Sequence, residues 1–199
     1  MEQPTRRTLS YYEHNCRSYI EATQNVPFAQ IRKLFTDHLC KGATVLDFGC
    51  GSGRDSLAFL QEGFKVEALD GSLQMCNETE KLTGIKTRNL TFDQFHDIAR
   101  YNGIWACASL LHVPYSELDE TFLRLHTALK ENGILYASFK EGSEEETRDG
   151  RLFTDLNIDR LNALPSFTAG FVLLETKATH AVDSRHKQTT WFNFIAKKK

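Results

Sequence analysis

The sequence VLDFGCGSG, residues 45–53, predicts a buried strand that runs directly into a glycine-rich turn. Gly49, Gly51 and Gly53 carry no Cβ, so the backbone of this turn can adopt positive φ and approach a ligand closely. The backbone N–H groups that open the next helix would point into the same space. Together these features indicate a site for a nucleoside-containing cofactor.

Two acidic residues indicate which kind of cofactor fits. Asp47 stands two residues before Gly49, where a carboxylate would repel a pyrophosphate but suits an amino-acid ammonium. Its spacing to Gly49 favours this role over simple capping of the turn. Asp70 ends the apolar-rich run 66–69, which predicts the second strand of a βαβ unit. An acid at that place typically binds ribose hydroxyls, and Asp47 before the glycines argues against NAD.

The composition is that of an ordinary folded domain. The chain has 199 residues, of which 41% are hydrophobic and 25% charged, and this suits one domain over residues 1–199. We expect residues 1–40 to form a helical lid over a Rossmann-like core of residues 41–199. The formal net charge of -2 and the pI near 6.4 argue against a general affinity for nucleic acid.

The cysteines and the N-terminal residues bear on the compartment. The five cysteines form no Cys-x-x-Cys pair and no Cys/His cluster, which favours reduced thiols over a disulfide framework or a metal site. The first residues lack the apolar core of a signal peptide, and no segment reaches the length of a membrane span. We therefore expect a cytoplasmic protein with no metal and no membrane contact.

Helical and strand patterns alternate along the chain. The predicted strands are 44–48, 65–70, 85–90, 103–108, 134–139, 171–179 and 189–196. The predicted helices are 11–40 with a break near Pro27, 53–62, one with Ser72 as N-cap, one from a Ser116–Asp119 capping box to about Lys130, and 157–164. The polar stretch 141–151 carries no predicted element.

This order of elements predicts an α/β fold. Strands separated by helices form a parallel sheet that is covered on both faces. The last two strands are joined by a short segment without a helix, residues 181–187, so they must be antiparallel. The expected architecture is a Rossmann-like, mostly parallel seven-stranded sheet with an antiparallel C-terminal hairpin. A dinucleotide dehydrogenase would continue with parallel βα units instead.

Three further motifs carry a family resemblance. They are GSGRDS at 51–56, GIWACASLLH at 103–112 and SFKEG at 138–142. With the acids and glycines described above, the chain resembles the class I S-adenosylmethionine-dependent methyltransferases. More closely, it looks like a branch of small bacterial enzymes grouped with the tellurite-resistance type. The resemblance implies that S-adenosylmethionine is the cofactor.

The resemblance also implies which residues bind this cofactor. They are Tyr12, Tyr19, Asp47, Gly49, Cys50, Gly51, Gly53, Arg54, Asp70, Gly71, Ser72, Met75, Thr91, Phe92, Asp93, Ala108 and Ser109. Thr91 departs from the branch, which usually has an acid here for the adenine amino group, so adenine recognition could move to Asp93 or to the backbone beside Phe92. Three roles stay open: Tyr12 and Tyr19 could be core contacts, and Arg54 could pair with Asp55 instead of the cofactor carboxylate.

The acceptor side is predicted from position alone. His112 follows the fourth predicted strand and is either a general base or a packing histidine, with no partner visible in the sequence. Lys140, Arg148 and Arg151 follow the fifth strand and would contact a small anionic or polar substrate, although the neighbouring run 144–146 of three glutamates also fits a solvated loop.

The favoured function is methyl transfer to a small molecule, because the core fold uses almost the whole chain. Two alternatives remain: a tRNA or protein methyltransferase whose partner supplies the recognition surface, and a module that binds S-adenosylmethionine without turnover. The first would show a basic face, and the second would have no cavity for an acceptor. The sequence leaves the oligomeric state and the methylated atom open.

Overall fold

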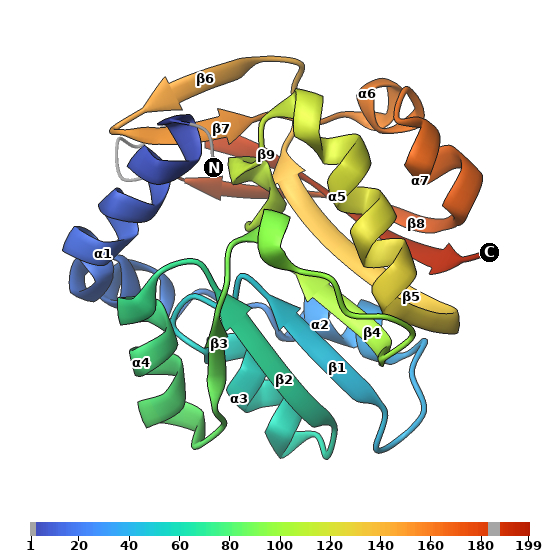
Figure 1. Cartoon of the computed structure of the whole chain (residues 1–199), viewed down its shortest axis with the longest axis horizontal. Helices are drawn as coiled ribbons and strands as arrows, with labels where there is room; N and C mark the ends of the chain where they lie inside the picture. The colour runs from blue at the N-terminus through green and yellow to red at the C-terminus, as the bar shows by residue number, and fades with distance from the viewer. Residues whose placement is uncertain (1–2, 183–187) are drawn as a thin grey trace.

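Seven strands of the computed structural model, which describes residues 3–182 and 188–199, form a single sheet (Figure 1). They are β1 (Thr44–Phe48), β2 (Lys65–Asp70), β3 (Thr87–Asn89), β4 (Tyr101–Ala106), β5 (Leu129–Lys140), β8 (Phe171–Val182) and β9 (Gln188–Lys198). Their order across the sheet is β3-β2-β1-β4-β5-β9-β8. The first five run parallel, whereas β9 is antiparallel to both β5 and β8.

Helices surround this sheet, and a small hairpin stands apart from it. The helices are α1 (Gln3–Thr23), α2 (Ala29–Thr36), α3 (Arg54–Gln61), α4 (Leu73–Thr83), α5 (Tyr115–Ala128), α6 (Ile158–Asn162) and α7 (Pro165–Gly170). Two 3-10 turns are η1 (Phe92–Gln94) and η2 (Leu110–His112). The hairpin consists of β6 (Glu145–Arg148) and β7 (Arg151–Thr154).

The two faces of the sheet bury alternate residues of each strand. Val45 packs with Ile31 and Phe35 of α2, whereas its neighbour Leu46 belongs to the cluster on the opposite face, which includes Phe122 of α5. This alternation is the period of two that a pleated strand imposes. Both faces are therefore apolar and covered, as a parallel sheet requires.

The strand order places a ligand site at the carboxyl ends of β1 and β4. From β1 the chain moves outward to β2 and β3, and then returns to the other side of β1 as β4. The helices that follow β1 and β4 therefore lead in opposite directions, which leaves a crevice at this switch point. The glycine turn after β1 and the segment after β4 flank that crevice.

Two segments distant in sequence lie over this end of the sheet. Figure 1 shows α1 beside the β6–β7 hairpin, and the backbone N–H of Leu152 in β7 donates a 3.0 Å hydrogen bond to the Thr8 hydroxyl of α1. Helix α1 is kinked at Asn15, which has non-helical φ and ψ. In contrast, α2 buries Ile31 and Phe35 against the sheet, so only α1 of the N-terminal helices covers the crevice.

The predicted sheet and its order of elements are confirmed, and β1 and β2 have the predicted bounds. The predicted cap of α4 is also confirmed, because the Ser72 hydroxyl accepts from Met75 N–H at 3.2 Å. The capping box at Ser116 and Asp119 is wrong: Pro114 precedes the helix, and Asp119 instead accepts hydrogen bonds from Ser166. The hairpin β6–β7 and helix α7 were not predicted, and most of the predicted connecting segment 181–187 lies outside the described residues.

Candidate functional site

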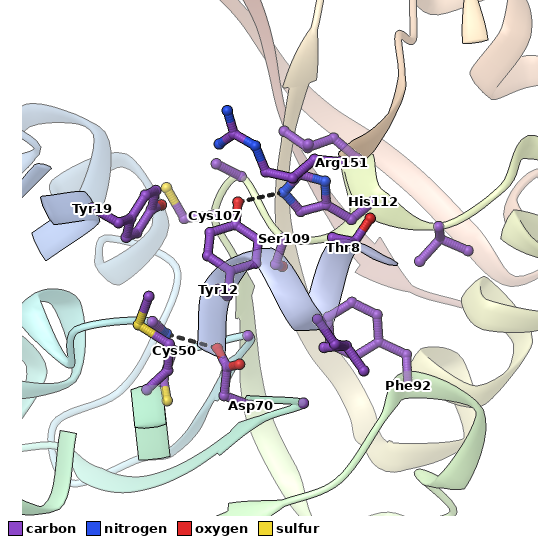
Figure 2. Close-up of a pocket in the computed structure, with 18 of the residues that line it drawn as sticks. Thr8, Tyr12, Tyr19, Cys50, Asp70, Phe92, Cys107, Ser109, His112 and Arg151 are labelled. Atoms are coloured by element: carbon purple, nitrogen blue, oxygen red, sulfur yellow. Dashed lines mark hydrogen bonds between the residues drawn. The ribbon is translucent and has the colours of Figure 1, made fainter. Parts of the chain in front are cut away.

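A cavity of about 910 Å³ lies at the carboxyl ends of β1, β2, β4 and β5. Its floor includes the glycine turn after β1 and the segment after β4, and residues of α1 and β7 also line it. Figure 2 shows Tyr12 of α1 within this space, with Asp70 on one side and His112 and Arg151 on the other. The cavity therefore has two ends. We call the end at Asp70 the acid end, and the end at His112 and Arg151 the His112 end.

The glycine turn approaches the segment after β4 very closely. Gly49 has a φ of +83°, and a Cβ on it would lie 2.5 Å from the Cβ of Ser109, so no other residue fits without displacing the backbone. Gly53, also at positive φ, precedes α3 and packs against Thr79 of α4. It does not line the cavity, and its role is to set the start of the helix.

Asp70 is fixed by backbone donors at the acid end. Its two carboxylate oxygens accept from Gly51 N–H at 3.0 Å and from Ser72 N–H at 2.8 Å. Burial raises the pKa of Asp70 to about 6, although these hydrogen bonds oppose the shift. Each oxygen retains a lone pair, so the carboxylate can still accept from a ligand hydroxyl. Ser72 itself lies outside the cavity lining and serves as the cap of α4.

Asp47 is the second carboxylate of the acid end and is only 3% exposed. It accepts a 2.6 Å hydrogen bond from the Ser56 hydroxyl. Burial, and next the negative charge of Asp55, raise the pKa of Asp47 to about 7. Burial disfavours the ionised form of this carboxylate. A cationic ligand would stabilise that form, because it brings a positive charge next to it.

Arg54 has a partner within the protein. Its guanidinium donates to both oxygens of Asp55, at 3.1 and 2.7 Å, and to the carbonyl of Thr23 at 3.1 Å, and it lies over the Phe28 ring at 4.1 Å. The structure therefore has the Asp55 pairing, one of the two roles that the sequence left open. Arg54 still lines the cavity beside Asp47.

A third group of lining residues comes from η1 and the end of β4. Thr91, Phe92 and Asp93 line the cavity, and the Phe92 ring stacks on Phe48 at 4.4 Å. Ser109 is 6% exposed, and its hydroxyl has no hydrogen-bond partner among the described residues. A buried hydroxyl without a partner is costly, so this atom marks a place for a polar ligand.

Ala108, next to Ser109, has a strained backbone. Its φ is +51°, in the left-handed region that side chains other than glycine rarely adopt. The Ser138 hydroxyl of β5 accepts from Ala108 N–H at 2.8 Å and helps to hold this conformation. Strain of this kind is typical of positions that aim a segment at a ligand.

His112 and Tyr12 form the centre of the His112 end. The Tyr12 hydroxyl lies 2.7 Å from His112 Nε2, and His112 Nδ1 lies 2.6 Å from the carbonyl of Leu152. A carbonyl only accepts, so Nδ1 carries the proton and donates to Leu152, and Nε2 accepts from Tyr12. Burial, and after it the positive charges of Arg151 and Lys140, lower the pKa of His112 to about 4, although the hydrogen bond to Leu152 opposes this shift. His112 is therefore neutral near pH 7.

Three cationic side chains surround the Phe153 ring at this end. Lys140 Nζ lies 3.9 Å from the ring centroid, and the guanidinium carbons of Arg151 and Arg148 lie at 5.1 and 5.6 Å. Arg151 also lies over Tyr11 at 4.1 Å. All three cations line the cavity, as do both tyrosines predicted on the N-terminal helix, Tyr12 and Tyr19, whose rings meet edge to face at 5.1 Å.

Two thiols of the cavity are protonated. Burial raises the pKa of Cys107 to about 12 and that of Cys50 well above its usual range. The Cys50 thiol also lies 3.3 Å from the Thr79 hydroxyl. Neither is a thiolate near pH 7, so neither fits the role of a nucleophile.

The fold brings nearly all of the predicted site residues together. Of those named from the sequence, only Gly53 and Ser72 lie outside the cavity lining. Sequence reasoning missed Thr8, Tyr11 and Phe153. The adjacent pair Tyr11-Tyr12 was a signal for one of them, whereas Thr8 and Phe153 depend on the hairpin that was not predicted.

No helix in the described part of the chain is long and apolar enough to cross a membrane. Residues 3–182 and 188–199 also contain no group of three or more His, Cys, Asp or Glu side chains arranged to hold a metal ion.

Comparisons with known proteins agree with this geometry. A family model described as a methyltransferase domain matches residues 19–176. A protein of Bacillus subtilis (strain 168) named "Putative methyltransferase YqeM" is 26% identical over 140 residues. That match includes 65% of this chain and 57% of the relative, so it spans less than two thirds of the relative's length.

Two solved structures share the fold. The 1,6-didemethyltoxoflavin-N1-methyltransferase of Burkholderia thailandensis, with bound 1,6-didemethyltoxoflavin and S-adenosylhomocysteine, has a TM-score of 0.79 and 19% identity, covering 100% of this chain and 92% of that one. The magnesium protoporphyrin IX methyltransferase of Synechocystis PCC 6803, with bound S-adenosylmethionine, has a TM-score of 0.73 and 16% identity, covering 100% and 99%. At these identities the likeness establishes the fold.

Proposed function

Because the chain belongs to the methyltransferase-domain family, we propose that it is a class I S-adenosylmethionine-dependent methyltransferase that acts on a small-molecule acceptor. One observation carries the proposal: a single cavity joins the acid end, with Asp47 and Asp70, to the His112 end. Its volume of about 910 Å³ is near the top of the range of roughly 300–1,000 Å³ that holds one drug-sized ligand. The cavity also extends beyond the acid end to His112 and Arg151, where an acceptor would lie next to the cofactor.

The acid end fits S-adenosylmethionine. Asp47 is a buried carboxylate that a ligand ammonium would stabilise, and Asp70 is held by two backbone N–H groups with lone pairs left for ribose hydroxyls. The unpartnered hydroxyl of Ser109 adds a polar group for the same ligand. Thr91, Phe92 and Asp93 would lie beside the adenine.

The protein contributes to the chemistry by positioning the acceptor next to the cofactor and by excluding water. When bound, S-adenosylmethionine supplies a methyl group on a positively charged sulfur. Helix α1 and strand β7 cover the His112 end through the Thr8–Leu152 and Tyr12–His112 hydrogen bonds, so an acceptor there is held away from solvent. His112 Nε2 is already occupied by the Tyr12 hydroxyl, and this favours a positioning role for His112 over direct proton abstraction.

The other candidate functions have less support. A module that only binds the cofactor needs no space beyond the acid end, whereas the cavity continues past Tyr12 to Arg151. A macromolecular acceptor would have to bring its reacting group to the His112 end, which α1 and β7 cover. The finer grouping with tellurite-resistance-type enzymes rests on the three motifs quoted above and is part of the proposal, as is a cytoplasmic location with five reduced cysteines.

Calorimetric titration tests the cofactor assignment. We expect S-adenosylmethionine and S-adenosylhomocysteine to bind with micromolar affinity and NAD to give no heat of binding, because Asp47 opposes a pyrophosphate. Asp37→Asn, a change at an exposed acid paired with Lys33 outside the cavity, serves as the control and should bind like the wild type. Tight binding of NAD without binding of S-adenosylmethionine would refute the assignment.

A further inference from the structure

Arg151 is the least satisfied cation at the His112 end. Its Nε atom is buried and has no hydrogen-bond partner among the described residues. Within the described part of the chain, the carboxylate nearest to its guanidinium is that of Asp149, at 3.9 Å, and this side chain is 70% exposed to solvent. The Arg151 side chain is 18% exposed, and an arginine in such a place whose Nε–H lacks a partner favours an anion from outside the protein.

Arg148 differs from Arg151 in this respect. Its guanidinium forms an ion pair with Glu146 and lies 3.6 Å from Asp155. Two carboxylates of the hairpin and its flank therefore neutralise Arg148. Its charge stabilises the hairpin, and Arg151 is left as the anchor for a ligand.

Two positive charges act on one point at this end. Arg151 and Lys140 both act on His112 and lower its pKa, so their charges converge on the same place. His112 is neutral and offsets neither charge. A bound S-adenosylmethionine would add a positive sulfonium to the cavity. An anionic acceptor would balance these charges, and a cationic one would meet repulsion from all of them.

The walls of the same space are aromatic. Tyr11, Tyr12 and Tyr19 of α1 and Phe153 of β7 line the cavity, and Trp191 of β9 lines it from the sheet. Flat rings pack favourably against such walls, whereas an inorganic ion gains nothing from them. The guanidinium fork of Arg151 matches the two oxygens of a carboxylate.

We infer that the acceptor is a planar aromatic acid whose carboxylate pairs with Arg151 while its ring lies among the aromatic walls. This inference rests on the proposed function and names the substrate class of the same site. Arg151 recognises the substrate, and no proton or bond changes at this residue.

Binding of small probes to the protein saturated with S-adenosylhomocysteine tests the inference without knowledge of the true substrate. The probes are benzoate, its neutral counterpart benzamide, benzylammonium and inorganic phosphate. We expect benzoate to bind at least about tenfold more tightly than benzamide, the usual effect of a hydrogen bond to a charged group, and benzylammonium not to bind. The Nε–H signal of Arg151 in protein with ¹⁵N-labelled arginine should shift with benzoate.

Variants separate the role of Arg151 from general damage. Arg151→Gln should remove the preference for benzoate over benzamide, and Arg151→Lys should keep part of it, because lysine retains the charge without the fork. Arg100→Gln, at an arginine paired with Glu67 outside the cavity, should keep all of it. Thermal melts establish that each variant is folded.

The outcomes distinguish this inference from the proposed function. Equal affinities for benzoate and benzamide, or an unchanged preference in Arg151→Gln, would overturn the inference while S-adenosylhomocysteine still binds. Phosphate bound as tightly as benzoate, and lost in Arg151→Gln, would replace the aromatic acid with an inorganic oxyanion. Failure of S-adenosylhomocysteine itself to bind would instead overturn the proposed function.

Discussion

The backbone N–H of Leu152 donates a 3.0 Å hydrogen bond to the hydroxyl of Thr8, which joins strand β7 to helix α1 across 144 residues of sequence. The carbonyl of the same Leu152 accepts from His112. One residue of β7 therefore fixes both the helix that covers the cavity and the histidine inside it. The Tyr12–His112 hydrogen bond completes this link, because Tyr12 also belongs to α1.

Thr8→Val should loosen α1 without unfolding the sheet. The change keeps the shape of the side chain but leaves the buried N–H of Leu152 without an acceptor, which costs about 1–3 kcal/mol. We expect faster amide hydrogen exchange in residues 5–23 and unchanged exchange in β1. Thr127→Val is the matched control, since the Thr127 hydroxyl bonds only within its own helix in an exposed position. Equal exchange in α1 for both variants would contradict the link.

His112 should make the protein less stable in mild acid. Its folded pKa of about 4 lies below the ordinary value of about 6.5, so the unfolded state binds the proton first as the pH falls. The contribution to stability is lost between about pH 6.5 and pH 4, and amounts to about 2 kcal/mol between pH 7 and pH 5.

Denaturant unfolding of His112→Gln tests whether His112 lowers the stability as the pH falls. The variant cannot titrate, so its free energy of unfolding should fall less than that of the wild type between pH 7 and pH 5. His96→Gln, at an exposed histidine outside the cavity, should behave like the wild type. If the free energy of unfolding falls equally with pH in the wild type and in His112→Gln, then the pKa of His112 is the same in the folded and the unfolded state. A base role for His112 would place the acid limb of turnover near pH 4, and not near the ordinary pKa of about 6.5 that the sequence alone suggests.

Cofactor affinity should depend on pH through Asp47. Burial raises the pKa of this carboxyl to about 7, and only its ionised form attracts an ammonium. The Kd for S-adenosylhomocysteine should therefore rise about tenfold from pH 7.5 to pH 6. Asp47→Asn should bind weakly at both values and lose this dependence. A wild-type Kd that stays constant over the range would remove Asp47 from contact with the ammonium.

Asp70→Ala should reduce both affinity and stability. Loss of the carboxylate is expected to weaken cofactor binding by roughly 1.5–3 kcal/mol. It also leaves the N–H groups of Gly51 and Ser72 without their acceptor, so a lower melting temperature is expected in addition. Titration and thermal melts measure the two effects separately. An unchanged Kd in a folded variant would show that Asp70 does not bind the cofactor.

The parts of the fold that depend on local patterns were predictable. The apolar runs of β1 and β2 end in glycine turns, and their bounds follow directly. The hairpin β6–β7 was not predictable, because β6 is mostly exposed and its sequence EETR has no apolar alternation. The signals at Ser116 and Asp119 were misleading, since Asp119 binds Ser166, a partner 47 residues away.

The candidate site likewise has a part that the sequence could predict and a part that it could not. Asp47, Gly49 and Asp70 lie within one βαβ unit, so spacing alone relates them. The partners of His112 come from α1 and β7, 100 and 40 residues away in sequence, and no local pattern connects them. The sequence could therefore suggest His112 as a residue of interest but not its protonation, which depends on Leu152 and Tyr12.

The cover formed by α1 and β7 has a kinetic consequence. The hydrogen bonds of Thr8 and Tyr12 must break for this cover to open, so they act on any ligand that enters or leaves the His112 end by that route. On that route, the dwell time of a bound molecule depends on two hydrogen bonds that lie away from the acid end. Sequence changes far from the cofactor, in the first turns of α1 or in β7, can in this way alter product release while affinity for the cofactor stays the same.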